Sequence, residues 1–227
     1  MRKLSCPLSA ALILLLSGPS FAQWIEHANV EEGFFINFPA EPLVEEITWE
    51  SEYRATFPAR VYSVETNRGR YSVTVVDYRE AKRIHTERVA PCVDGSEPCL
   101  GPITSSDTGV GIGYWRPDVQ GSMVYAASQF LERDAEMTHF AWGLIAFVEG
   151  LRLHLTNPDQ SRTLASFYLH ADRLYILEAT TPEGVRGGGL FLQSLQFLDE
   201  EGDRIHYKRV YHNSAPPPAR MPLPGGL

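Results

Sequence analysis

The chain has 227 residues, of which 44% are hydrophobic, a length and composition that suit one globular domain with its own core. Its 28 acidic residues outnumber 20 basic ones and give a formal net charge of −8. This acidity excludes the basic stripe that a nucleic-acid partner requires, and it argues against adhesion to an anionic membrane surface.

The first 22 residues have the pattern of an export signal. Arg2 and Lys3 supply a positive start, residues 8–16 form a short apolar run, and the small residues Ser20 and Ala22 suit signal peptidase. The run is too short to cross a membrane, which takes roughly 20 apolar residues, and no other segment is long or apolar enough. We therefore predict cleavage after Ala22 and a periplasmic or secreted mature chain.

The mature chain keeps two cysteines, Cys92 and Cys99, and is more acidic than the precursor. An even pair in an oxidising compartment predicts a disulfide that stiffens one local loop. Metal binding by the pair is the alternative, although zinc sites favour C-x2-C spacing with further Cys or His nearby. Without Arg2 and Lys3, 18 basic and 28 acidic residues remain, a net charge of −10 that is expected to keep the domain soluble.

The segment that follows the export signal is predicted to be mostly strand. Residues 33–38 form a short apolar run, and residues 43–49 are expected to form a second strand. Residues 59–65 and 71–78 alternate between apolar and polar side chains on either side of an Asn-Arg-Gly turn, which predicts a hairpin. Residues 80–89 then suit a short charged helix.

Residues 91–117 show no regular pattern and are predicted to form a long loop. They hold both cysteines, several Gly and Ser residues, and the aromatic pair Tyr114 and Trp115. A structureless stretch of this length in a compact domain indicates a functional loop or an insertion. Trp115, beside Tyr114, is the best candidate for an exposed aromatic contact, and the alternative is a core anchor for the loop.

The second half of the domain is predicted to be a helix, a block of strands and a closing helix. The apolar stripe of residues 122–133 has helical spacing. Strands are expected at residues 138–148, 151–155, 163–170 and 173–180, followed by part of a helix at 191–195. The Pro-rich residues 214–227 are predicted to be a disordered tail, which leaves a single α+β domain at residues 23–213.

Four short motifs in this order resemble the PsbP-like family. Residues 33–39 (GFFINFP) are similar to its opening motif, and residues 71–78 (YSVTVVDY) to its second hairpin strand. Residues 173–177 (RLYIL) and 191–197 (FLQSLQF) are similar to a later strand and to the closing motif. The resemblance implies an α+β fold in which an antiparallel sheet is sandwiched between helices. It implies no binding residue, because no ligand motif matches.

The sequence carries no catalytic signature. It has no G-x-S-x-G, H-E-x-x-H, P-loop or EF-hand motif. His154 and His170 fall in the predicted strand block, and on one sheet face they would approach each other near Asp159 or Asp172 and form a metal site or an acid/base pair. The simpler interpretation is polar residues on the solvated face of an antiparallel sheet.

Two functions follow from these observations. The first is an exported, non-catalytic module without a cofactor, which binds an unknown protein or small ligand through the long loop and the sheet face. Its candidate binding residues are Tyr114, Trp115, His154 and His170. The alternative is a metal-dependent or acid/base hydrolase built on His154 and His170.

Overall fold

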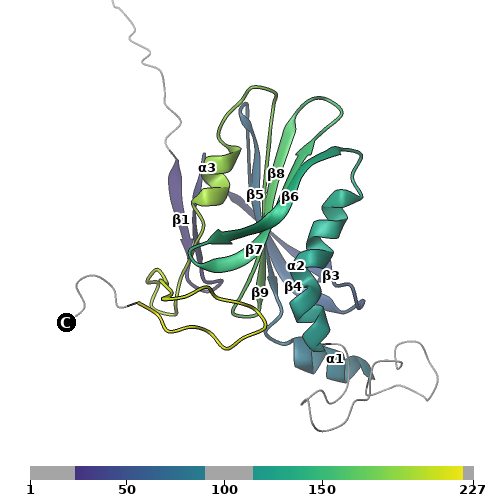
Figure 1. Ribbon diagram of the computed structural model, residues 1–227, viewed down its shortest axis with the longest axis vertical. Coiled ribbons are helices and arrows are strands. Elements are labelled where there is room, and N and C mark those ends of the chain that lie inside the picture. Colours follow the sequence, from purple (N-terminus) through teal and green to yellow (C-terminus); the bar gives the residue numbers. More distant parts are fainter. Residues whose placement is uncertain (1–23, 90–114, 222–227) are drawn as a thin grey trace, which may run out of the picture.

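A computed structural model describes residues 24–89 and 115–221 (Figure 1). Its centre is a seven-stranded antiparallel sheet with the order β3-β4-β5-β9-β8-β7-β6. The strands are β3 (Leu43–Glu50), β4 (Thr56–Thr66), β5 (Gly69–Asp77), β6 (Glu136–Ile145), β7 (Val148–Thr156), β8 (Arg162–His170) and β9 (Arg173–Thr181). The hairpin predicted over residues 59–78 is confirmed, since Val64 pairs with Tyr71 and Ala59 with Val76. The predicted pair of strands around residue 172 is β8 and β9.

Two tight hairpins set the register of four of these strands. Ala146 and Phe147 join β6 to β7 with φ values of 47° and 63°, and Ala171 and Asp172 join β8 to β9 with values of 49° and 56°. Positive φ at both central residues gives a two-residue turn the twist that matches the flanking strands. Neither turn contains glycine, so both hairpins hold side chains in the left-handed region, where each such residue costs roughly 1 kcal/mol.

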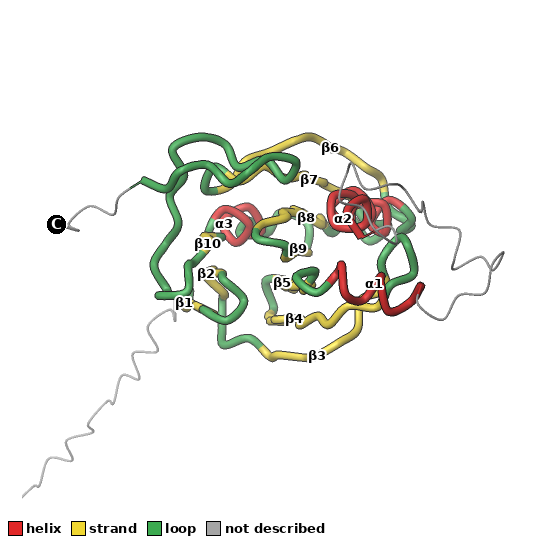
Figure 2. Tube along the Cα trace, turned by 90° about the horizontal axis from the view of Figure 1, so that it is seen from below, coloured by secondary structure: helices red, strands yellow, loops and turns green. Residues whose placement is uncertain are grey.

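The two faces of the sheet are covered differently (Figure 2). Helices α1 (Ala81–Val89) and α2 (Trp115–Leu131) cover one face. The other face carries the short helix α3 (Gly188–Gln193) and a small antiparallel sheet in the order β1-β2-β10, formed by β1 (Ile25–Asn29), β2 (Phe34–Phe38) and β10 (Gln196–Phe197). The predicted antiparallel α+β sheet is therefore present, but on its second face a small sheet largely replaces the predicted helices.

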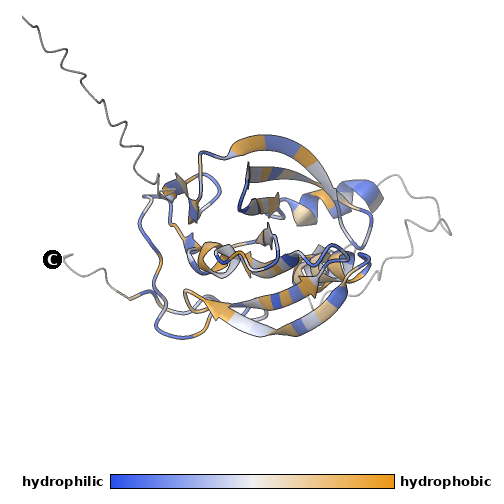
Figure 3. Cartoon of the chain, turned by 90° about the horizontal axis from the view of Figure 1, so that it is seen from above, coloured by the Kyte–Doolittle hydropathy of each residue, from blue (hydrophilic) through white to orange (hydrophobic). Residues whose placement is uncertain are grey.

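Side chains that alternate along the central strands contribute to two separate hydrophobic cores, one on each face of the large sheet. In β5, Tyr71, Val73 and Val75 point into the core beneath α3 and β2, whereas Val76 points into the core beneath α2. Figure 3 shows the resulting mixture of apolar and polar segments along the strands. A strand covered on both faces needs apolar residues on both, so β8 and β9 are buried over most of their length.

The structure differs from two boundaries that the sequence predicts. Helix α2 begins at Trp115, so residues 115–117 belong to its first turn and not to the long loop. Residues 214–221, predicted as the start of a disordered tail, are held in place by main-chain hydrogen bonds: Lys208 N–H donates to Ala219 O, and Met221 N–H donates to His206 O. Within residues 24–89 and 115–221, no helix has the length and apolar character needed to cross a bilayer.

Candidate functional site

Two adjoining clefts lie at the end of the sheet where β5 ends and β9 begins. The register places Asp77, the last residue of β5, opposite Arg173, the first of β9. The β1–β2 turn, with Glu31, and the chain after β5, with Arg79, complete this end. Glu31, Arg79 and Arg173 line both clefts, so the two hollows share a wall.

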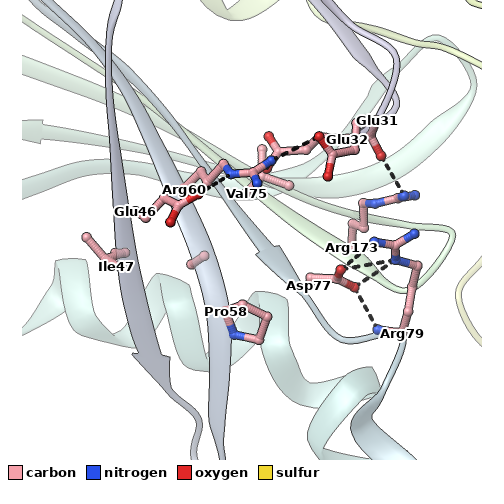
Figure 4. A pocket seen from close by; sticks show the side chains of 11 residues that line it. Glu31, Glu32, Glu46, Ile47, Pro58, Arg60, Val75, Asp77, Arg79 and Arg173 are labelled. Atoms are coloured by element: carbon pink, nitrogen blue, oxygen red, sulfur yellow. Dashed lines mark hydrogen bonds and ion pairs between the residues drawn. The ribbon is translucent and has the colours of Figure 1, made fainter.

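The first, which we call the charged cleft, has a volume of about 200 Å³ (Figure 4). Arg60 on β4 holds three carboxylates within 3.4 Å, those of Glu31, Glu32 and Glu46. Glu32 is buried to 9% exposure, and burial raises the pKa of its carboxyl. One wall of the charged cleft thus gathers three acids around a single guanidinium.

Opposite that wall, Arg79 is tied to Asp77. The Arg79 side chain donates from Nε to Asp77 Oδ1 at 2.9 Å, and its main-chain N–H donates to the same oxygen at 3.0 Å. Burial alone would raise the pKa of Asp77, but these hydrogen bonds from Arg79 outweigh it, and the pKa lies below its usual value. The pair is therefore fully charged at neutral pH.

Arg173 differs from Arg60 and Arg79 because no ion pair with a described residue holds its guanidinium, although its charge acts to lower the pKa of Asp77 and of Asp172. Its Nη2 donates to the main-chain oxygen of Glu31 at 2.9 Å. Among the described residues, no carboxylate oxygen lies within 4.0 Å of the guanidinium nitrogens of Arg173, the distance that defines an ion pair. Figure 4 shows the Arg173 guanidinium between Glu31 and Asp77. Arg173 also lines the second cleft. A planar guanidinium with spare donors suits a carboxylate or phosphate group.

The second, which we call the aromatic cleft, has a volume of about 810 Å³. Its lining includes His170, Tyr175, Tyr207 and Tyr211, with Arg173 on its rim. The last two tyrosines come from the segment after β10, which returns to the sheet beside Val148. Both signs of charge line the cleft, since it also contains Glu31, Asp172, Asp199, Glu200 and Glu201 beside Arg79, Arg173 and Arg220. An aromatic floor with charged groups around it is a common form of small-molecule site.

His170 is fixed in this floor as a neutral ring. It is 3% exposed, its Nε2 shares a hydrogen bond of 2.7 Å with Tyr207 Oη, and its ring lies 4.3 Å from that of Phe197. Burial, helped by the nearby Arg220 and Arg173, lowers the pKa of His170 to about 3. An imidazole that stays neutral far below pH 7 is a poor acid/base catalyst.

The structure does not bring His154 and His170 together. His154 on β7 lies opposite Leu164 of β8, and His170 is six residues farther along that strand, roughly 20 Å away. His154 instead stacks near His139 of β6, with ring centroids 4.7 Å apart. In the described part of the chain, no group of three His, Cys, Asp or Glu side chains is arranged to hold a metal ion.

The aromatic and cysteine predictions have different outcomes. Trp115 is partly buried and packs against the core beneath α2, so it matches the core-anchor alternative. Tyr114, Cys92 and Cys99 lie outside the described residues, and the predicted contact and disulfide stay predictions. Arg173 was not predicted as a site residue, because its environment comes from turns more than 140 residues apart, which no local pattern joins.

Comparisons with known proteins identify no family for the chain. No family model matches the chain, and no curated protein does. The structure is similar to the solution structure of cyanobacterial PsbP (CyanoP) from Synechocystis sp. PCC 6803, with 13% sequence identity and a TM-score of 0.42, over 85% of this chain and 99% of that one. A cyanobacterial PsbP is thus among the solved structures to which this chain is similar.

Proposed function

We propose that the protein is an exported, non-catalytic module that binds a small anionic ligand in the aromatic cleft. The observation that carries this proposal is Arg173, a guanidinium on the wall between two clefts that is held by one main-chain oxygen. The volume of about 810 Å³ lies in the range of small-molecule sites. A ligand carboxylate would meet Arg173, and its body would rest on Tyr207 and Tyr211.

The geometry favours binding over catalysis. The hydrogen bond to Tyr207 already occupies Nε2 of His170, and the low pKa keeps the ring neutral at the pH of most compartments. The hydrolase alternative requires His154 and His170 to share a site, and a distance of roughly 20 Å along β8 separates them. The cleft therefore offers recognition groups without a poised proton donor.

Binding is tested by titration with paired probes. Benzoate carries a carboxylate on a ring, and benzamide has the same shape without the charge. We expect benzoate to shift the NMR signals of residues around Arg173. Benzamide should bind at least 10-fold more weakly, since a charged hydrogen bond contributes about 1.5–3 kcal/mol. Arg173→Met should remove the response to benzoate. Arg162→Met, on the exposed start of β8, is the matched control. An undiminished response in Arg173→Met would contradict the proposal.

Export is tested separately. The full-length chain is produced in a bacterial host, and the periplasmic and cytoplasmic fractions are analysed by N-terminal sequencing. The positive start, apolar run and small-residue exit predict a periplasmic product that begins at Gln23. A product that stays in the cytoplasm with Met1 intact would refute this part of the proposal and leave the ligand site unaffected.

A further inference from the structure

The two outer strands of the large sheet, β3 and β6, have contrasting chemistry (Figure 2). Strand β3 carries three glutamates, Glu45, Glu46 and Glu50. Charges on an edge strand oppose pairing with another chain. Strand β6 and the turn after it contain no Asp, Glu, Lys or Arg from Met137 to Phe147. Of the two outer strands, only β3 therefore carries charged side chains along its length that oppose pairing with another chain.

The unprotected strand exposes large apolar side chains. Phe140, Trp142 and Leu144 are 44%, 67% and 48% exposed. They alternate along the strand and so project from one face of the sheet. The opposite face carries the small residues Ala141 and Gly143 between them. Strand β6 thus presents a row of large side chains on one face and small ones on the other.

The same three residues direct their main-chain groups outward. Leu144 pairs with Glu149, but Glu149 N–H donates to Tyr211 O, and Leu144 O accepts from Arg152 Nη2 at 2.8 Å. Leu144 and Glu149 are therefore a non-hydrogen-bonded pair. Because such pairs alternate along an antiparallel ladder, Phe140 and Trp142 also present N–H and C=O to the free edge.

We propose that two copies of this chain associate by antiparallel pairing of their β6 strands about a twofold axis at Trp142. In this register Trp142 faces Trp142 of the second copy, and Phe140 faces its Leu144. Each of these residues has outward main-chain groups, so the pairing forms about six main-chain hydrogen bonds. On the other face Ala141 meets Gly143 of the second copy, and Arg152, whose side chain lies over Gly143, is the large side chain at this contact.

A second β6 strand fits this edge better than an arbitrary strand would, because its side chains match in size. Large residues meet large ones and small residues meet small ones under one twofold operation. Strand β6 itself brings no formal charge from Met137 to Phe147 to the contact between two acidic copies. A twofold contact also closes on itself, and it leaves the glutamate-bearing β3 as the outer strand at both ends. The association therefore stops at a dimer.

Arg152 competes with this association. Its side chain crosses Gly143, where a Cβ would lie 2.5 Å from Arg152 Nε, and it occupies the carbonyl of Leu144. Phe140 N–H of the second copy needs that same carbonyl. The contact buries roughly 1,000 Å², near the lower end for specific interfaces, so we expect a dissociation constant on the order of micromolar.

Sedimentation velocity of the purified chain from about 1 to 200 μM tests the proposal. We expect a shift from monomer to dimer, lost in Trp142→Lys and strengthened roughly 10-fold in Arg152→Ala, which frees the carbonyl of Leu144. Leu43→Lys, at a 78% exposed position on β3, is the matched edge control and should dimerise like the wild type. A monomer at every concentration, or a dimer lost in Leu43→Lys and kept in Trp142→Lys, would overturn the proposal.

A cross-link tests the twofold axis itself. In a Trp142→Cys variant the two introduced thiols face each other in a hydrogen-bonded pair, whose Cα separation of about 5.5 Å suits a disulfide. We expect a covalent dimer on a non-reducing gel after mild oxidation, and none above the wild-type level for Leu43→Cys. Equal cross-linking of both variants would show that β6 is not the contact.

Discussion

Three polar side chains lie buried where α1, α2 and the end of β3 meet. Asp118 Oδ2 accepts a hydrogen bond from Ser51 Oγ at 2.6 Å and lies 2.8 Å from His85 Nε2, and all three residues are at most 2% exposed. The serine donates to the carboxylate and not to the imidazole, so the arrangement lacks the serine–histidine contact that activates a nucleophile. It fastens two helices to the sheet.

Removal of this carboxylate should be costly. Asp118→Ala leaves Ser51 and His85 buried without their shared acceptor, so we expect a loss of about 3–5 kcal/mol in unfolding free energy by urea denaturation. Asp118→Asn keeps one acceptor oxygen and should lose less. Asp134→Ala, at an exposed position, is the control and should change stability by less than about 0.5 kcal/mol. Equal stability of the Asp118 and Asp134 alanine variants would refute the role of the cluster.

His170 should make the fold acid-sensitive. Its folded pKa of about 3 lies below its unfolded value near 6.5, so between these values the unfolded chain binds more protons than the folded one. Stability should therefore fall as the pH drops below 6.5, by at most about 1.4 kcal/mol per pH unit. Urea denaturation from pH 7.5 to 4.5 measures the slope. The slope of unfolding free energy against pH should become smaller in His170→Gln. It should stay unchanged in the control His206→Gln, whose position is exposed. Identical slopes in the wild type and both variants would contradict the assignment to His170.

At the scale of elements, the two glycine-free hairpins store conformational strain. Ala171 is exposed with φ of 49°, a region where glycine has no steric penalty. Ala171→Gly should therefore stabilise the protein by about 0.5–1 kcal/mol in thermal unfolding. Ala28→Gly, in the exposed part of β1 without positive φ, should destabilise it by a similar amount. If both variants changed the stability in the same direction, backbone strain at Ala171 would be excluded as the cause.

The elements show where local sequence was sufficient. The hairpin of β4 and β5 was predictable, because period-2 alternation and a Gly-containing turn both act locally. The start of α2 was not, since Pro117 and Gly121 interrupt its pattern, although proline is tolerated in a first helical turn. The small sheet was also missed: β10 has two residues, and its pairing with β2 is decided by tertiary packing.

At the scale of the whole molecule, the segment after β10 completes the core. Ile205, Tyr207 and Tyr211 are at most 9% exposed and pack with β2 and α3. The sequence predicted a domain that extends to residue 213 but did not assign this irregular segment to the core. His170 was chosen from the strand pattern, whereas its tyrosine partners come from a stretch with no strand or helix periodicity, so the cleft could not be predicted as a unit.

Two truncations separate the parts of this segment. A stop after Asp203 removes the three buried side chains, each worth about 1.5–3 kcal/mol, and should abolish cooperative thermal unfolding. A stop after Asn213 removes the exposed Arg220–Asp199 ion pair and a few main-chain hydrogen bonds, and should cost about 1–2 kcal/mol. Circular dichroism melting curves measure both, and equal melting temperatures would show that the core does not need the segment.

The buried cluster of Ser51, Asp118 and His85 has a consequence for chain length. It fastens α1 and α2 to each other through residues outside 90–114, so both ends of that stretch are anchored by contacts that the stretch does not supply. Val89 and Trp115 therefore keep their places without contacts from the residues between them. We therefore expect that a foreign peptide inserted between Val89 and Trp115 would leave the sheet, both clefts and the β6 edge folded, because the contacts that hold α1 and α2 lie outside the insertion.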